Sequence, residues 1–251
     1  MMTMLWAFLF GLSSTVHAEQ GNWSQGTADV LPKGRWETGV FSPLRIGIRD
    51  GTELDIHPVW AILAPHLSIK QHLHEQDGWR FAVRQSISYP THLLRFLSRE
   101  GIAGILTPDV DIPHIIGADT SFLATTNLND NHLFTGWFRL KAGFGFGEST
   151  YHTIDFPLVY PRTAVLQNGI GTEIGVRFAG SVIKDLGYRI DIEGWWLPTA
   201  EGSFFQENYL YATWQPSARF SAQIGCITSY GQFPYGENWH IMPGFDLMFA
   251  K

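Results

Sequence analysis

The sequence has a single cysteine, few charged residues and, after its first eighteen positions, no long apolar run. One cysteine excludes an internal disulfide framework and any zinc site built from several thiolates. Only 16% of the 251 residues are charged, and the formal net charge is −6. No basic stripe is present for a phosphate backbone, so nucleic acid is not an expected partner. Apolar stretches such as Ile102–Leu106 are far shorter than the ~20 residues of a membrane-spanning helix.

The first eighteen residues contain the exception. Leu5–Leu12 is an apolar run, and the chain continues with Ser13–Thr15 and then Val16-His17-Ala18. This order is typical of a secretory signal peptide that is cleaved after Ala18. No Lys or Arg precedes the run, and an uncleaved anchor is the alternative, but the run is shorter than the ~20 residues that a span requires. We therefore expect a signal peptide at residues 1–18 and one domain at residues 19–251. No lipid anchor is expected at the cleavage site, because no cysteine follows it.

Period-two alternation of apolar and polar residues dominates the rest of the chain. It is strongest in the segments 79–89, 134–144, 170–178 and 188–196. Weaker alternation occurs at 35–41, 53–57, 66–73, 115–124, 204–214, 219–228 and 245–249. Successive side chains of a strand point to opposite faces, and a helical period fits none of the strong segments. The pattern therefore predicts an all-β chain.

Turns and one long irregular stretch interrupt these runs. Residues typical of turns separate the runs at 49–51, 76–78, 127–131, 184–187 and 198–202. Residues 90–114 break the rhythm and contain Pro90, Pro108 and Pro113. This stretch predicts a long loop or a short helix that acts as a lid or plug.

Two architectures explain strong alternation in an exported chain: a soluble sandwich with its apolar face inside, or a membrane barrel with its apolar face outside. The strong runs match the ~9–11 residues of a tilted transmembrane strand, and their polar faces combine charge with glycine, as in a polar lumen. Tryptophan and tyrosine also gather near strand ends, as an interfacial aromatic girdle requires. These residues are Trp36, Trp60, Trp79, Tyr89, Tyr160, Tyr188, Trp196, Trp214, Tyr230 and Trp239. We predict an antiparallel transmembrane β-barrel of 12 strands, with ten as the second choice.

The end of the chain, Met242–Lys251, carries Phe245, Leu247 and Phe249 in alternation. It resembles the closing strand and membrane-insertion signal of bacterial outer-membrane barrels, in which the aromatic residue is commonly the last one. The segments Leu31–Glu37 and Ile46–Leu54 resemble outer-membrane transporters, including barrels associated with aromatic-compound degradation pathways. The resemblance implies a location in the bacterial outer membrane. It also implies contact with membrane lipid, the barrel-insertion machinery and small solutes.

Charged residues on the polar faces of the expected strands are the most informative candidates. They are Lys70, Arg80, Arg84, Arg139, Lys141, Glu173, Arg177, Arg189, Asp191 and Glu193. One interpretation is a pore lining that favours small anions or polar solutes. The other is a closed interior in which opposite charges pair across strands and hold the wall together. The sequence leaves both open.

Other candidate chemistry is weaker. His66, His72 and His74 lie near Glu75 and Asp77, which makes a metal site conceivable, but polar lumen and turn residues are the favoured interpretation. On one strand, His66 and His72 are expected to share a face, as are His72 and His74. No cofactor is expected.

An enzyme is not expected either. No Gly-x-Ser-x-Gly elbow occurs, and Ser86 and Ser88 fall on an inward face, away from the lipid interface. Asp191 and Glu193 lie beside Arg189, which indicates ion pairing. Cys226 is expected to be a small lipid-facing residue.

The function expected from these features is a passive channel or transporter for small solutes. A structural or interaction barrel with a plugged lumen is the alternative, and an interfacial hydrolase is the third possibility. The position of residues 90–114, inside or outside the lumen, distinguishes the first two.

Overall fold

The computed structural model describes residues 23–58, 61–99, 110–147, 157–166, 169–200, 202–233 and 236–251. They form a closed barrel of twelve antiparallel strands, in which each strand pairs with its neighbours in sequence and β1 pairs with β12. The strands are β1 (Trp36–Gly39), β2 (Leu44–Arg49), β3 (Thr52–Ile56), β4 (His66–Gln76), β5 (Trp79–Ser88), β6 (His114–Asn129), β7 (His132–Phe146), β8 (Ile170–Ile183), β9 (Leu186–Trp196), β10 (Phe204–Ser217), β11 (Phe220–Phe233) and β12 (Gly236–Ala250). The all-β prediction and the count of twelve strands are confirmed.

The barrel wall has its apolar face outside and its polar face inside, which is the reverse of a soluble protein. On β8, Ile170, Ile174 and Phe178 are exposed, whereas Glu173 and Arg177 between them are buried. The other long strands follow the same rule, so large apolar side chains cover the outside and charged side chains fill the inside. This arrangement excludes the sandwich. None of the helices in the described ranges is long and apolar enough to cross a membrane.

Two strands differ from the prediction. β2 lies outside the alternating segments, and β12 begins at Gly236, nine residues before the expected segment 245–249. Pro243 and Gly244 hide the pattern, yet β12 pairs with β11 without interruption from Phe249 opposite Phe220 to Gly236 opposite Phe233. Pairing with β11 thus outweighs the weak strand propensity of these residues.

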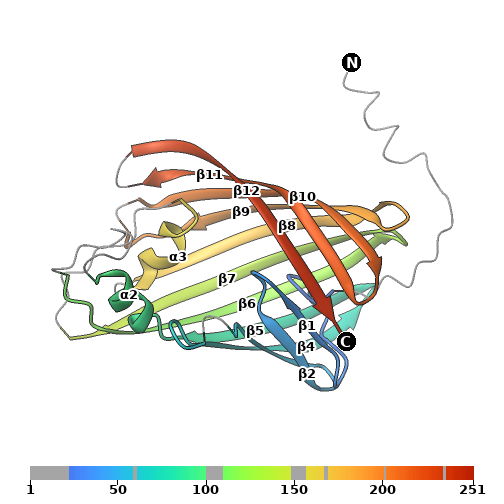
Figure 1. Cartoon of the computed structure of the whole chain (residues 1–251), viewed down its shortest axis with the longest axis horizontal. Coiled ribbons are helices and arrows are strands. Elements are labelled where there is room, and N and C mark those ends of the chain that lie inside the picture. Colours follow the sequence, from blue (N-terminus) through green and yellow to red (C-terminus); the bar gives the residue numbers. More distant parts are fainter. Residues whose placement is uncertain are drawn as a thin grey trace.

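The two ends of the barrel differ in their connections (Figure 1). At one end, which we call the turn end, neighbouring strands are joined by two-residue turns at 50–51, 77–78, 130–131, 184–185 and 218–219. The left-handed φ of 51° at Asp77 and 77° at Gly78 is what a tight hairpin turn needs. The start of β1 and Lys251 lie at the same end, where the two termini of the barrel wall meet.

The opposite end, which we call the loop end, carries the longer connections. In the described part of these connections there are three short helices: α2 (Thr91–Leu97), α3 (Tyr160–Thr163) and the 3-10 helix η1 (Ala164–Leu166). α2 belongs to the β5–β6 connection, and α3 and η1 belong to the β7–β8 connection. Figure 1 shows all of this helical structure on the left and the C-terminus on the right.

Candidate functional site

Paired charges line the inside of the barrel. The structure places all ten charged candidates on the inner face: Lys70, Arg80, Arg84, Arg139, Lys141, Glu173, Arg177, Arg189, Asp191 and Glu193. Arg177 donates two hydrogen bonds of 2.7 and 2.8 Å to Asp191. Arg139 Nη1 and Lys141 Nζ lie 3.0 and 3.2 Å from Glu173 Oε2. Cross-strand pairs of opposite charge therefore stabilise the wall, as the second interpretation expects.

Further buried charges come from the short strands β1 to β3, and sequence reasoning missed them. Glu37 and Arg45 approach to 3.4 Å, and both are almost fully buried. Asp55 Oδ2 lies 2.7 Å from Arg84 Nη2, and Glu53 Oε1 lies 3.3 Å from Lys70 Nζ. These strands are too short to give a strong alternation signal, which is why their inward charges were not recognised.

Residues 23–31, which we call the lumen segment, run inside the barrel before β1 begins. Ser24, Ala28 and Leu31 are buried. The backbone N–H of Ala28 donates to Thr125 Oγ1 at 2.8 Å, and that of Leu31 donates to Glu53 Oε2 at 3.0 Å. Backbone polar groups away from water need such partners, so the charged inner wall holds this segment in place.

Basic side chains of the wall bind the same segment. Lys70 Nζ donates to the carbonyl oxygen of Ser24 at 2.9 Å, and Arg177 Nη1 donates to that of Gln25 at 2.5 Å. Arg80 Nε lies 2.5 Å from Asp29 Oδ1. The segment is therefore anchored to several strands around the barrel.

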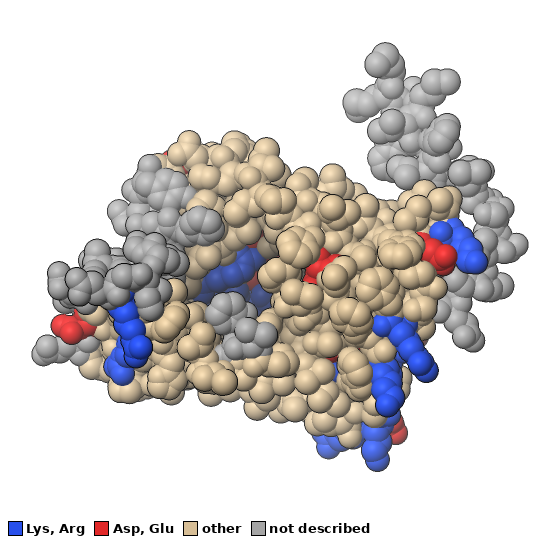
Figure 2. Space-filling model, viewed as in Figure 1, with Lys and Arg blue, Asp and Glu red and all other residues tan. Residues whose placement is uncertain are grey.

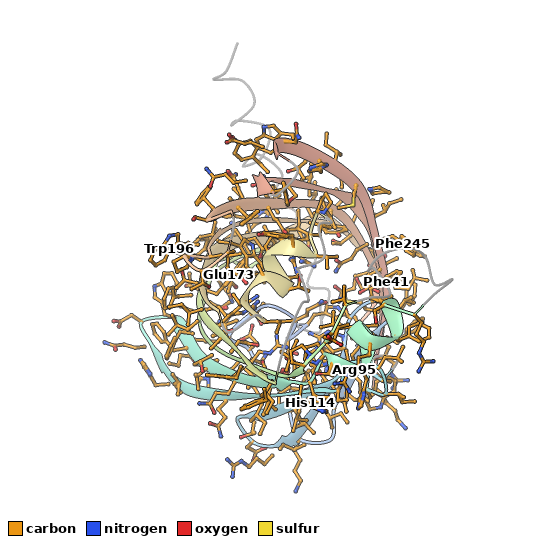
Figure 3. All side chains as sticks on the ribbon, turned by 90° about the vertical axis from the view of Figure 1, so that its left-hand side faces the viewer. Phe41, Arg95, His114, Glu173, Trp196 and Phe245 are labelled. Carbon is orange, nitrogen blue, oxygen red and sulfur yellow. The ribbon has the colours of Figure 1, made fainter. Side chains whose placement is uncertain are left out.

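A second obstruction, the α3–η1 plug, enters the lumen from the loop end. Figure 3 looks toward that end and shows α3 across the middle of the opening, near Glu173. The plug packs its apolar side chains against inward residues of the wall. This core cluster contains Tyr160, Ala164, Val165, Trp195, Leu197, Phe205 and Phe233. Gly143 on β7 provides the space, because a Cβ there would lie 2.1 Å from the carbonyl oxygen of Val165.

Arg162 of α3 makes the polar contacts of the plug, which we call the Arg162 latch. Its guanidinium donates to both carboxylate oxygens of Glu207 at 2.8 Å, and its Nη2 donates to Tyr209 Oη at 2.8 Å. Glu193 Oε1 lies 3.4 Å away, and the guanidinium carbon stands 5.0 Å from the ring centre of Trp195. Burial lowers the pKa of Arg162, but the facing tyrosine and carboxylates raise it by more. The Arg162 guanidinium therefore stays positively charged.

Residues 90–114 contain a short helix, one of the two forms predicted for this stretch. Their described part contains α2, where Leu94 packs with Ile115 and with Leu166 of η1. The Thr91 hydroxyl accepts from the Ile115 N–H at 2.8 Å, which fixes α2 to the start of β6. Figure 3 shows Arg95 at the edge of the opening, and residues 100–109 lie outside the described ranges. Among the described residues, the lumen segment and the α3–η1 plug obstruct the lumen, and the role of residues 90–114 as a lid or plug stays a prediction.

Described residues enclose two cavities that lie in line between the two ends of the barrel. The larger, which we call the chamber, has a volume of about 280 Å³ and lies between the lumen segment and the plug. Its charged lining comprises Arg45, Lys70, Arg84, Arg139, Arg162, Arg177 and Arg189 with Glu53, Asp55, Glu173, Asp191 and Glu193. The smaller, of about 180 Å³, lies toward the turn end and shares Gln25, Thr27 and Arg177 with the chamber. The contact between Arg177 and Gln25 thus forms part of the partition between them.

The predicted girdle residues lie at both ends of the wall. Trp36, Trp79, Tyr188 and Trp214 are near the turn end, and Tyr89, Trp196, Tyr230 and Trp239 are near the loop end. Trp60 lies outside the described residues. Tyr160 is a correction: it is buried in the plug, because α3 folds into the lumen. Phe245, Leu247 and Phe249 point outward on β12, and their role in membrane insertion stays a prediction.

The histidine and serine candidates do not form a separate site. A bulge between His72 and His74 sets them opposite Ala82 and Phe81, so the expectation that they share a face is wrong. Among the described residues, no group of three or more potential metal ligands occurs. The serines bond to neighbouring strands, with Ser86 Oγ donating to Asp119 Oδ1 at 3.3 Å.

A closed antiparallel wall with an apolar outside and a charged inside defines a transmembrane β-barrel, and this architecture is that of bacterial outer-membrane barrels. Comparison with known proteins adds similar folds but no family. No family model matches the chain, and no curated protein matches it.

Solved structures similar to this chain are outer-membrane channels. The COG4313 outer membrane channel from Pseudomonas putida F1 aligns with a TM-score of 0.48 and 8% identity over 91% of this chain and 98% of that one. The NanC porin aligns with a TM-score of 0.47 and 6% identity over 86% of this chain and 96% of the porin. The channel DcaP of Acinetobacter baumannii aligns with a TM-score of 0.43 and 8% identity over 84% of this chain. The chain spans 62% of the length of that channel. All three TM-scores are below 0.5, so no functional conclusion rests on them.

Proposed function

We propose that this protein is a passive channel for small polar solutes in the bacterial outer membrane. The observation that carries the proposal is the pair of cavities inside the barrel, which are separated by side chains and one segment of backbone. The polar lining hydrates solutes, and small shifts of Arg177 or Arg162 connect the cavities with each other and with the loop end. Outer-membrane lipid and the barrel-insertion machinery are the other partners that the proposal includes.

The two ends suggest an orientation. Outer-membrane barrels have short periplasmic turns and longer extracellular loops. The turn end, where both ends of the wall meet, is then periplasmic, and the plug faces the outside. A solute from outside passes the α3–η1 plug, enters the chamber and leaves past the lumen segment.

A structural barrel with a closed lumen is the second candidate, because the lumen is occupied from both ends. Heat-dependent gel mobility of detergent-extracted protein, followed by planar-bilayer conductance of the same sample, separates the two. We expect a mobility shift and discrete conductance steps. A shift without steps would support the closed barrel, and soluble protein without a shift would contradict the membrane barrel itself.

The charge of the chamber predicts its ion preference. Its lining has seven basic and five acidic side chains, so we expect anions to permeate better than cations. Replacing Arg84 and Arg139 together by glutamine should lower the anion-to-cation permeability ratio at least about threefold, measured as reversal potential in a KCl gradient. Arg219→Gln, in an exposed turn, is the control and should leave the ratio unchanged. An unaltered ratio in the double variant would show that ions bypass the chamber.

A further inference from the structure

The barrel wall has much shorter strands on one side, which we call the low side, than on the other. β1, β2 and β3 have four, six and five residues, whereas β6, β7 and β8 have 16, 15 and 14. Six residues of a strand tilted by about 40° rise roughly 15 Å, which is less than the ~25 Å apolar band of an outer-membrane barrel. The described strands on the low side are therefore too short to separate the lumen from lipid over the full thickness of the membrane.

The gap lies above β1, toward the loop end. β1 pairs only with Met248–Ala250 of β12, and the Val40 N–H then donates to the Leu247 carbonyl oxygen at 3.1 Å. β12 continues beyond this point to Gly236, while β3 ends at Ile56 and β4 begins at His66. We call the space between these strand ends the notch. In Figure 1, β12 crosses the near face above the short strands, and Figure 2 shows a hollow there with Lys and Arg side chains at its bottom.

Pro243 indicates that this edge of β12 is not built for strand pairing. Lys251 N–H donates to Trp36 O, whereas Ala250 N–H donates to Arg219 O on the other side of the strand. Odd-numbered residues of β12 thus turn their backbone polar groups toward β1 and the notch. Pro243 is also odd-numbered, so it faces the notch, and it lacks the N–H that a pairing strand would need.

The rim of the notch is apolar, although the chamber behind it is charged. Phe41, Ile62, Ile241 and Phe245 are 61%, 81%, 74% and 58% exposed. Phe41 packs edge-to-face on Phe245 with ring centres 5.0 Å apart, and Figure 3 labels the two residues on the same side of the barrel. Pro43, two residues after Phe41, lines the chamber. The apolar rim and the charged chamber are therefore adjacent, because Phe41 at the rim and Pro43 in the chamber lining are two residues apart.

We propose that the notch is a lateral portal through which an amphipathic organic anion, with one carboxylate and an apolar tail, passes between the chamber and the membrane. The carboxylate binds the basic side chains of the chamber, while the tail lies along the apolar rim in contact with lipid. The charge then never enters hydrocarbon, which avoids the largest barrier to leaving the lumen sideways. The missing donor at Pro243 favours such a ligand over a strand from another protein. The proposal rests on the channel function and adds a second exit to it.

Photo-crosslinking of the full-length protein in liposomes tests the portal. The probes are decanoic acid with a diazirine on its tail and the methyl ester of the same acid. We expect the acid, but not the ester, to label the peptides that carry the rim residues Phe41, Ile241 and Phe245, and unlabelled decanoate to compete. Ile241→Glu should reduce this labelling about tenfold or more, because it sets a like charge at the rim. Ile174→Glu is the matched control on β8, where the side chain is 65% exposed, and should have no effect.

Several outcomes would overturn the portal. Equal labelling by acid and ester, uniform labelling around the lipid-facing surface, or equal effects of the two Glu variants would each show ordinary lipid contact. A crosslinked dimer through β12 would show that a second copy covers the notch. KCl conductance of the same preparations is measured in parallel. Normal conductance without labelling of the rim rejects the portal alone, and labelling without conductance rejects the channel alone.

Discussion

A barrel that lacks residues 23–31 is expected to carry at least about three times the single-channel current of the intact protein. The lumen segment partitions the inside of the barrel, because the contact of Arg177 with Gln25 separates the chamber from the turn-end cavity. Its removal joins the two cavities and opens the chamber to the turn end. Glu37 and Lys70 lose partners in the segment, but water replaces them once the lumen is flooded.

Planar-bilayer recordings of the deletion variant and of the intact protein measure this effect. Lys33→Ala is the matched control, since Lys33 is exposed and lies just after the lumen segment, outside the residues that bind the segment to the wall. Thr125→Val gives a milder version, because it removes the acceptor of the Ala28 N–H and the hydrogen bond to the Thr135 hydroxyl but leaves the segment in place. Heat-dependent gel mobility verifies that each barrel is folded. An unchanged current in a folded deletion variant would show that the segment does not limit permeation.

Arg162→Leu should release the α3–η1 plug and produce frequent transitions to a higher conductance level. The substitution leaves Glu207, which is fully buried, without its bidentate partner. Breaking a buried ion pair from one side costs about 3 kcal/mol, enough to shift the plug toward its undocked state. Single-channel records measure the fraction of time spent at the higher level. Glu207→Gln added to Arg162→Leu removes the buried charge and should restore part of the closed time.

A steric variant tests the same plug independently of charge. Gly143→Val places a side chain where the backbone of η1 now lies, with the nearest carbonyl oxygen 2.1 Å from the new Cβ. It should raise the open fraction as Arg162→Leu does. Gly136→Val on the same strand is the control, because a Cβ there has its nearest neighbour at 3.9 Å. If Arg162→Leu and Gly143→Val both left the current unchanged, the plug would not be a gate.

The wall of the barrel could be derived from local pattern. Glu173 and Arg177 alternate with Ile174 and Phe178, and the structure places the first pair inside and the second outside. This worked because the side-chain direction in a strand depends only on position along the chain. The pattern failed where its signal is weak: β2 has no alternating segment, although most of it belongs to the Ile46–Leu54 segment that resembles outer-membrane transporters, and the start of β12 was missed because Pro243 and Gly244 interrupt the apolar series.

The contents of the lumen could not be derived in the same way. Residues 23–31 contain neither alternation nor a motif, and their burial results from contacts such as that of Ala28 with Thr125, 97 residues away. Arg162 gave no signal either, because its partners lie on β9 and β10 and meet it only when the plug is seated. In residues 90–114 the prolines indicate a long loop, but they do not predict that Leu94 of α2 packs against Leu166 of η1.

Strand period, turn residues and composition therefore suffice for the class of fold and the charged inner face, since each depends on neighbours in sequence, whereas the choice of twelve strands over ten needed the structure. The occupied lumen, the chamber and the notch depend on which distant segments meet. The height of the wall at β1 depends on where pairing with β12 stops, and the seat of the plug depends on the buried carboxylate that faces Arg162. Such contacts are selected by closure of the barrel, which brings residues together that share no local pattern.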